Sequence, residues 1–477
     1  MDNLVKKTSK PMKEKEWDKL DVQIEHAGRS ITLPADPGNM PIKKAMEALA
    51  RKLADEEQVF KVHEPIDAYP HDAAVAFVKA MCNLYGWASP VTPPGFFSSP
   101  PEMMSVKTGP RDEDVIQCPI GTFKLPGVDQ PINAIIYRGQ FIIHGDVKKK
   151  DRHLMLELAT ETRRIVREES IYRGKPIRML VDDDGDLMDN VPPTFLDVSD
   201  VSEADVLFDD HIKHQIDVNL LVPLKHTAKC RAAGIPLKRS VLLEGPFGTG
   251  KSLLQRMVAK VAQDNGWTYV LLDKIQGLQA ALEFALRYAP AIISGEDIDR
   301  IAEVRDDGMN HLMNTMDGVL SKNSEVMCVL TTNFVKKLGP VILRPGRLDA
   351  IISTRAPGPK TVEKLIRHYG RDLVPPEADL SRAGKELAGQ IPASIRECVE
   401  RSKLAMIGRG ADVLSDSDLV VSAQTMKNHL ALLNEEKPNQ SDADILADSL
   451  RKVVGNGNGA HLENIEKSLK RVVQSVC

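Results

Sequence analysis

In the first part of the chain, apolar residues follow a helical spacing in some segments and form short strand-like runs in others. Helical spacing of apolar residues occurs over residues 41–58, 73–85 and 151–169. Short strand-like runs lie at residues 134–137 and 140–143. Arg138 and Gly139 separate those two runs, as in a hairpin turn. We therefore expect one α+β domain over residues 40–195, preceded by a flexible tail over residues 1–39.

From about residue 206 the pattern becomes regular, with short apolar strands alternating with helical segments. The strand candidates are residues 240–243, 268–272, 291–294 and 326–331. Such alternation predicts a parallel sheet with helices on its faces, and we place this α/β domain at residues 196–356. After Pro357 the spacing becomes helical throughout, which predicts a helical domain over residues 357–435.

The remaining residues, 436–477, predict a polar linker followed by short helices. One stripe there is apolar and favours a docking helix over a membrane anchor: Leu462, Ile465, Leu469, Val472, Val473 and Val476.

An acidic run at residues 182–186 does not fit the EF-hand calcium motif. Counting from Gly185 as loop position 6 puts Leu180 and Val191 at the ligand positions 1 and 12, and neither side chain can bind calcium. We interpret that run as a solvated turn.

Composition narrows the class of protein. Of 477 residues, 42% are hydrophobic and 27% charged, and the net charge is −4, so no basic field favours nucleic acid or an anionic membrane. No apolar stretch is long enough to span a bilayer, and we expect a cytoplasmic protein without membrane contact. The six cysteines are scattered without C-x-x-C pairs, which favours free thiols.

A glycine-rich loop between an expected strand and an expected helix carries the strongest chemical signal. It fits G-x-x-x-x-G-K-[ST] and comprises Gly245, Pro246, Phe247, Gly248, Thr249, Gly250, Lys251 and Ser252, with Leu253 next in the helix. Backbone N–H groups in such a loop converge on phosphate oxygens at the positive end of the helix. Lys251 would supply a charge to the β- and γ-phosphates, and the Ser252 hydroxyl would complete a Mg²⁺ shell. The loop predicts ATP and Mg²⁺ as cofactors.

Further motifs extend the signal over residues 206–405, which resemble the AAA family of AAA+ ATPases. They are residues 314–319 (Asn-Thr-Met-Asp-Gly-Val), Thr331-Thr-Asn333, Arg344-Pro-Gly-Arg347-Leu-Asp349 and Leu365-Ile-Arg-His368. The resemblance implies a P-loop AAA+ parallel-sheet domain with a helical lid. It also implies that Asn333 orients the attacking water and that His368 lies near the adenine and ribose. Arg344 and Arg347 would act on the ATP of the adjacent subunit, which requires a ring, expected to be a hexamer.

Two features depart from the family pattern. The strand ends in Glu296-Asp297 instead of Asp-Glu, a swap that resembles the mitochondrial Rieske-protein translocase. We assign Glu296 to the Mg²⁺ shell and Asp297 to polarising water, with Asp299 as an alternative metal-side acid. The interval at residues 273–280 lacks the aromatic pore residue of protein-threading members. Separately, the C-terminal part has no His-Glu-x-x-His motif, so we expect no fused zinc protease of the membrane-protease type.

The function predicted from these features is that of a ring-forming ATPase. It would couple ATP hydrolysis to the remodelling of a protein or nucleoprotein partner, which the domain at residues 40–195 would recruit. The swapped acids and the missing aromatic favour a second hypothesis, a nucleotide-gated assembly scaffold with little turnover. A third is a DNA-associated loader or helicase accessory. Residues 206–405, which would drive the remodelling, have no basic stripe and no base-stacking aromatics, which argues against that third hypothesis.

Overall fold

The computed structural model describes residues 22–26, 29–33, 42–87, 89–92, 100–182, 191–299, 324–335, 338 and 348–435. The chain forms two compact units. The first comprises Met1–Val206, His211–Pro246 and Lys251–Ser353, and the second comprises Leu207–Asp210, Phe247–Gly250 and Thr354–Cys477. The predicted motif at residues 314–319, Arg344, Arg347 and the C-terminal segment 436–477 lie outside the described residues.

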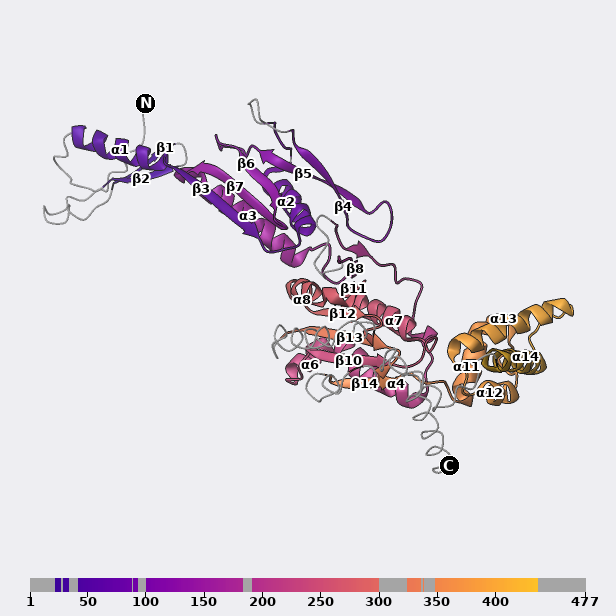
Figure 1. The fold of residues 1–477 in the computed structure, drawn as a ribbon. Helices are drawn as coiled ribbons and strands as arrows, with labels where there is room; N and C mark the ends of the chain where they lie inside the picture. Colours follow the sequence, from indigo (N-terminus) through magenta and orange to yellow (C-terminus); the bar gives the residue numbers. More distant parts are fainter. Residues whose placement is uncertain are drawn as a thin grey trace, which may run out of the picture. The chain divides into compact units, whose positions relative to one another are not determined.

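The first unit begins with an antiparallel sheet in the order β3-β7-β6-β5-β4 (Figure 1). Its strands are β3 (Val59–Ile66), β4 (Glu102–Lys107), β5 (Val115–Phe123), β6 (Ile132–Tyr137) and β7 (Gln140–Lys148). Helices α2 (Pro70–Tyr85) and α3 (Arg152–Glu168) pack against it, and α1 (Ile42–Glu56) precedes it. Arg138 and Gly139 join β6 to β7 with φ of 48° and 71°, the left-handed conformation that a tight two-residue hairpin requires. We call α2, α3 and these strands the N-terminal sheet domain.

Within the expected tail at residues 1–39 the structure has a hairpin instead. β1 (Val22–His26) pairs antiparallel with β2 (Arg29–Leu33). Apolar residues alternate in both strands, at Val22 and Ile24 and at Ile31 and Leu33. Two five-residue strands give a short signal, and the charged residues around them masked it.

The second sheet confirms the predicted α/β fold. In the part of the chain that is described it has seven strands, in the order β14-β10-β13-β12-β11-β8-β9. They are β8 (Pro176–Met179), β9 (Thr194–Phe195), β10 (Arg239–Glu244), β11 (Thr268–Leu272), β12 (Ala291–Gly295), β13 (Val326–Thr332) and β14 (Ala350–Ser353). All neighbours pair in parallel except β8 and β9. We call this sheet with its helices the α/β domain.

β8 and β9 lie within residues 40–195, where the sequence analysis placed the N-terminal domain. β8 instead pairs with β11, with Tyr269 opposite Pro176 and Leu272 opposite Met179. A strand of four residues shows no distinctive period, and its partner lies some ninety residues later. The pairing therefore could not be predicted from local sequence.

Helices of the α/β domain are α4 (Asp210–Ile216), α5 (Val222–Lys225), α6 (Thr227–Ala232), α7 (Lys251–Asp264) and α8 (Leu278–Arg287), with a π-helical stretch at Asp217–Leu221. Across the described chain, short 3₁₀ turns lie at Lys149–Asp151, Glu203–Asp205, Ile275–Gly277 and Arg371–Leu373.

Among the described residues, no helix combines the length and the apolar composition that crossing a bilayer would require.

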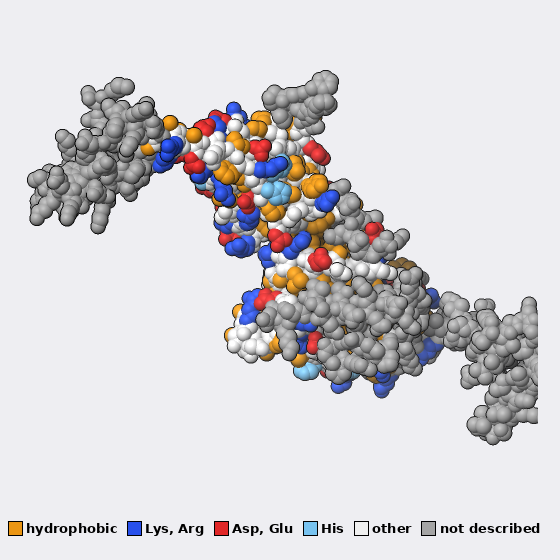
Figure 2. Space-filling view, turned by 60° about the vertical axis from the view of Figure 1, so that its left-hand side comes forward, with side chains coloured by type: hydrophobic (Ala, Val, Ile, Leu, Met, Phe, Trp, Pro, Cys, Tyr) orange, Lys and Arg blue, Asp and Glu red, His pale blue; other side chains and the backbone are white. Residues whose placement is uncertain are grey.

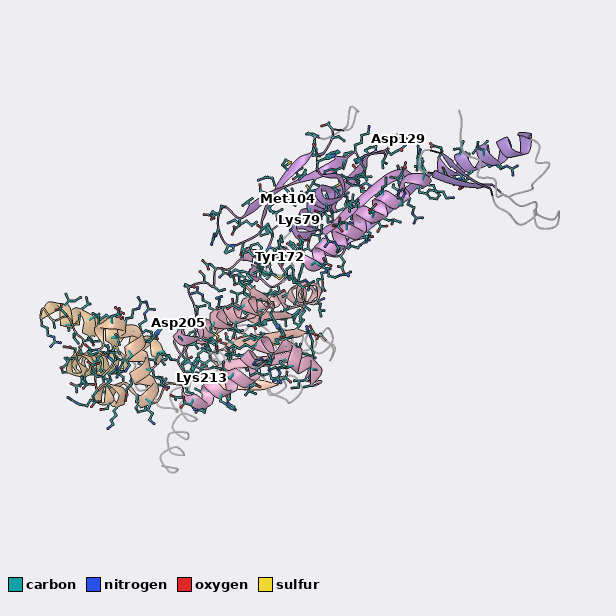
Figure 3. The ribbon with its side chains drawn as sticks, turned by 180° about the vertical axis from the view of Figure 1, so that it is seen from behind. Lys79, Met104, Asp129, Tyr172, Asp205 and Lys213 are labelled. Carbon is teal, nitrogen blue, oxygen red and sulfur yellow. The ribbon has the colours of Figure 1, made fainter. Side chains whose placement is uncertain are left out.

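A cluster of buried aromatic rings joins the N-terminal sheet domain to the α/β domain. Tyr172, which is labelled in Figure 3, lies edge-on to Tyr69, Phe284 and Tyr288, with ring centroids 5.7–5.9 Å apart. One hydrophobic core runs through both domains. On the face drawn in Figure 2, basic and acidic side chains are interspersed over the N-terminal sheet domain.

The second unit is helical. It contains α11 (Pro359–Gly370), α12 (Ser381–Leu387), α13 (Pro392–Gly408) and α14 (Asp416–Glu435), within the range where the sequence predicts a helical domain. Their apolar faces share a core that includes Val362, Ile366, Ile395, Val399 and Leu419. The tip of the glycine-rich loop, Phe247–Gly250, belongs to this unit.

Candidate functional site

The glycine-rich loop lies between β10 and α7, in the strand–loop–helix context that the motif requires. Gly248 and Gly250 have φ of 77° and 95°, which side-chain-bearing residues rarely adopt. A Cβ on Gly248 would lie 2.9 Å from Ile391 Cδ1 and 3.0 Å from Ala393 Cβ, at the start of α13. The loop tip is therefore shaped by backbone conformation and by the close approach of α13.

The other predicted loop residues differ in their exposure. Phe247 is 63% exposed and Leu253 is 36% exposed, whereas Thr249 is 1% exposed. The Thr249 and Thr354 hydroxyls are hydrogen-bonded at 2.9 Å, within the helical unit. His368 lies on α11, with its ring 5.3 Å from that of Tyr369. Its predicted contact with the nucleotide base stays a prediction.

Lys251, the first residue of α7, is 8% exposed and turns back over the loop. Its Nζ donates to the carbonyls of Gly245 (2.7 Å) and Pro246 (3.0 Å) and to Asn333 Oδ1 (2.8 Å). Burial lowers the pKa of Lys251, and the carboxylates of Asp297 and Asp299 raise it back in part. The ammonium is thus held at the loop by oxygen acceptors, and a phosphate could compete with them for it.

Asn333 connects Lys251 to the acids beyond β12. Its Oδ1 accepts from Lys251, and its Nδ2 donates to Asp297 Oδ1 at 2.8 Å. Because one partner is a cation and the other an anion, the amide has only one favourable orientation. Asn333 follows β13, which pairs with both β10 and β12. The parallel register therefore brings these three residues together from three distant segments.

The three acids after β12 occupy different environments. Glu296 is exposed, whereas Asp297 is half-buried, has φ of 50°, and donates its backbone N–H to Thr331 Oγ1 at 3.1 Å. Asp299 is 5% exposed, and its Oδ1 accepts from Thr332 Oγ1 (2.8 Å) and from the backbone N–H of Asn333 (3.1 Å). Asp299 therefore fixes the end of β13.

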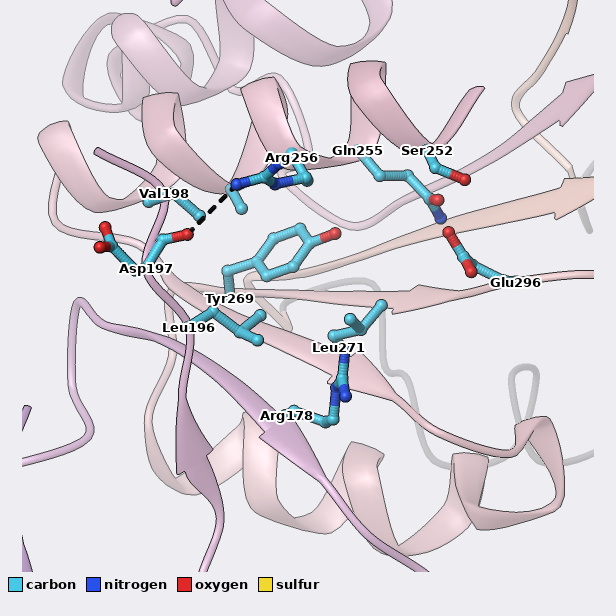
Figure 4. A pocket seen from close by; sticks show the side chains of 11 residues that line it. Arg178, Leu196, Asp197, Val198, Ser252, Gln255, Arg256, Tyr269, Leu271 and Glu296 are labelled. Atoms are coloured by element: carbon cyan, nitrogen blue, oxygen red, sulfur yellow. Dashed lines mark hydrogen bonds between the residues drawn. The ribbon is translucent and has the colours of Figure 1, made fainter. Parts of the chain in front are cut away.

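A pocket of about 180 Å³ opens beside the glycine-rich loop (Figure 4). Its lining residues come from α7, β8, β11 and the segments after β9 and β12: Arg178, Leu196, Asp197, Val198, Ser252, Gln255, Arg256, Ala259, Tyr269, Leu271 and Glu296. Ser252 and Glu296, the two residues assigned to the metal from sequence, thus line one cavity. A hydroxyl and a carboxylate are hard oxygen ligands, which fit Mg²⁺ bound jointly with nucleotide phosphates.

The sequence analysis missed a polar pair behind this pocket. Ser294, inside β12, is fully buried, and its Oγ accepts from Gln255 Nε2 at 2.7 Å. Two signals could have indicated it: Ser294 interrupts an apolar strand, and Gln255 follows Ser252 by three residues on the same face of α7. Neither signal identifies the other residue as its partner.

Comparison with known proteins agrees with this geometry. Residues 241–356 match the family model described as "ATPase family associated with various cellular activities (AAA)". The chain is 28% identical over 239 residues to the ATP-dependent zinc metalloprotease FtsH of Mesoplasma florum, a match that covers 46% of this chain and 36% of that protein. It is 27% identical over 269 residues to the ATP-dependent zinc metalloprotease FtsH 2 of Methylacidiphilum infernorum, covering 51% and 40%.

The chain therefore spans about two fifths or less of the length of these relatives. The family model describes an ATPase, both relatives are named as ATP-dependent, and the glycine-rich loop lies between β10 and α7. Residues 241–356 are thus similar to the AAA ATPase family, and they include the glycine-rich loop between β10 and α7.

Proposed function

We propose that this protein hydrolyses ATP with Mg²⁺ and uses the energy to remodel a macromolecular partner, a protein in our leading hypothesis. The observation that carries the proposal is the hydrogen-bonded series from Lys251 through Asn333 to Asp297. It connects the loop that would hold the triphosphate to the acid that would polarise water. Chemistry of this kind depends mainly on positioning and on charge stabilisation, and in this proposal the series would provide both.

Each predicted residue has a role in this proposal. The loop N–H groups and Lys251 bind the phosphates, and Ser252 and Glu296 hold Mg²⁺, which would neutralise developing charge on the phosphoryl oxygens. Asp297 and Asn333 bind and orient the attacking water. The proposed place of this activity is the cytoplasm, as the sequence analysis predicts.

Assembly into a ring, with six subunits as the leading prediction, forms the second part of the proposal. Arg344 and Arg347 of one subunit would complete the site of the next, an arrangement that can raise turnover by about 10³–10⁵-fold in enzymes with arginine fingers. His368 would contact the adenine and ribose. A chain that stays monomeric in saturating ATP and still turns over at full rate would contradict this part.

The test of the ATPase proposal is Lys251→Ala, with Lys260→Ala as the matched control. Lys260 lies on the same helix and pairs with Asp264 at the surface. We expect ATP turnover of the Lys251 variant to fall at least about 100-fold, since it loses the charge that contacts the β- and γ-phosphates. Turnover of the Lys260 variant should match the wild type. Equal turnover in all three proteins would refute the proposal.

A nucleotide-gated scaffold is the second candidate. The observation in its favour is that Asp297, one methylene shorter than the glutamate of the family pattern, is already engaged by Asn333. Phosphate release at the rate of a no-enzyme control, combined with assembly that depends on ATP, would favour the scaffold over the ATPase.

A further inference from the structure

In the side-chain amide of Gln255, the nitrogen is hydrogen-bonded, whereas the oxygen has no hydrogen-bond partner among the described residues. The side chain is 2% exposed, and its Nε2 donates to Ser294 Oγ. The hydroxyl of Tyr269 on β11 is also hydrogen-bonded to Ser294. With Nε2 donating to Ser294, Oε1 is the acceptor of the amide that stays available.

Gln255 Oε1 is buried and has no hydrogen-bond partner among the residues that the structure describes. A buried acceptor without a donor is costly, so such atoms in native proteins usually meet water or a ligand. The side chain lines the same pocket as Ser252 and Glu296. In Figure 4 the ends of these three side chains lie together at one end of the pocket.

The polar atoms at that end select the class of ligand. Gln255 offers a carbonyl oxygen, Glu296 a carboxylate and Ser252 a hydroxyl, so the group is rich in oxygen acceptors. Such a set suits a hydrated cation and disfavours an anion. In Figure 4 both arginines of the pocket lie away from these three side-chain ends, and Arg256 is already bonded to Asp200 at 2.6 Å.

We propose that Gln255 is a positioning residue for the divalent cation: its Oε1 accepts a hydrogen bond from a water molecule of the hydrated ion that Ser252 and Glu296 hold. Mg²⁺ keeps several of its waters when bound, and each water is a donor. The inference rests on the proposed function. It also accounts for Ser294, whose Oγ accepts from Nε2 and leaves Oε1 as the available acceptor of the amide. Residues that orient metal-bound groups in this way typically change metal affinity 10–100-fold when replaced.

The experiment measures Mn²⁺ binding to the full-length chain in the presence of ADP, by electron paramagnetic resonance, without any turnover. Gln255→Leu keeps the approximate size of the side chain and removes the acceptor. We expect its affinity for Mn²⁺ to fall about 10–100-fold. ADP affinity in excess EDTA should match the wild type, because Gln255 contacts no part of the nucleotide in this proposal.

Two further variants separate the metal role from packing. Ser294→Ala removes the partner of Nε2 but leaves Oε1 in place, and it should cost less than Gln255→Leu. Gln255→Glu keeps an acceptor and adds a negative charge, so it should bind Mn²⁺ at least as tightly as the wild type. This variant decides the matter if the leucine variant does not fold.

Three results would overturn the inference. Unchanged Mn²⁺ affinity in Gln255→Leu would mean that Oε1 binds a water molecule unrelated to the ion. Equal losses of affinity in Gln255→Leu and Ser294→Ala would mean that the effect comes from altered packing, and weaker Mn²⁺ binding by Gln255→Glu would contradict a role for the acceptor. Failure of the proposed function looks different, since the wild type itself would then bind no Mn²⁺ with ADP.

Discussion

Replacing Tyr288 with phenylalanine removes one hydroxyl that joins the N-terminal sheet domain to the α/β domain. Tyr288 follows α8 and is 1% exposed. Its hydroxyl accepts from the backbone N–H of Tyr69 at 2.9 Å and donates to the carboxylate of Asp72. Tyr69 and Asp72 both lie at the start of α2. A single hydroxyl group therefore forms hydrogen bonds with two buried groups of the neighbouring domain.

The expected loss can be estimated from these two contacts. Phenylalanine keeps the ring and its packing against Phe284, whose centroid is 4.6 Å away, so the buried apolar area barely changes. The N–H of Tyr69 loses its acceptor, at about 1–3 kcal/mol. Asp72 loses a bond to a charged group, at about 1.5–3 kcal/mol, but keeps those from Ile171 N and Ser170 Oγ. Because the two terms share one atom and are not additive, we expect a total of about 2–4 kcal/mol.

The loss should depend on pH. Burial raises the pKa of Asp72 above its ordinary value of 3.8, and the hydrogen bonds from Ile171, Ser170 and Tyr288 oppose that rise. Without the hydroxyl, the folded-state pKa rises further. An acid whose folded pKa lies above its unfolded pKa stabilises the fold below the unfolded value and loses that contribution as pH rises through the folded value. The deficit of the variant should therefore be larger at neutral pH than near pH 4.5.

The assay is hydrogen exchange by mass spectrometry over residues 68–73 and 288–291, together with urea denaturation, each at two pH values. A local readout is needed because a chain of several domains need not unfold in two states. Tyr137→Phe is the control, since Tyr137 is 55% exposed and should change nothing beyond about 0.5 kcal/mol. The reasoning fails if these residues exchange as slowly in the Tyr288→Phe variant as in the control. It also fails if the variant loses the same free energy of unfolding at both pH values.

Two further predictions concern the nucleotide site. Gly248→Ala should lower ATP affinity and the free energy of unfolding, because the residue has φ of 77° and its Cβ would collide with Ile391. Gly234→Ala is the control: with φ of 67° and open space around the Cβ, it should lower the free energy of unfolding only by the backbone strain of about 1 kcal/mol. Equal melting shifts for the two variants would show that the collision is unimportant. Asn333→Asp puts a second carboxylate against Asp297 and should reduce kcat about 10²–10³-fold, with nucleotide affinity changed only a few-fold in an equilibrium binding assay. A wild-type kcat would contradict the role of the amide.

How far the sequence predicts this structure depends on the distance between interacting residues. The strand, the glycine-rich loop and the helix at residues 240–262 are contiguous, so local pattern alone places them correctly. The family resemblance implied a parallel sheet, but the order of its strands was not predicted. The pairing of β8 with β11 and the bond between Tyr69 and Tyr288, 219 residues apart, had no local signal. These long-range contacts unite the two domains of the first unit into one core.

The end of β12 shows why a strand can depart from the apolar pattern without losing its place in the sheet. A buried parallel strand favours β-branched apolar residues, yet β12 ends in Ser294-Gly295 immediately before the acids. Ser294 supplies the acceptor that Gln255 needs, and an apolar residue there would leave a buried amide N–H unpaired. At Gly295 a Cβ would lie 2.7 Å from Ile275 Cδ1, in the turn after β11. Each departure therefore corresponds to one contact, and the two contacts are made at the two residues that precede Glu296. Such local exceptions are expected where a fold positions functional groups, which supports placing the chemistry at this edge of the sheet.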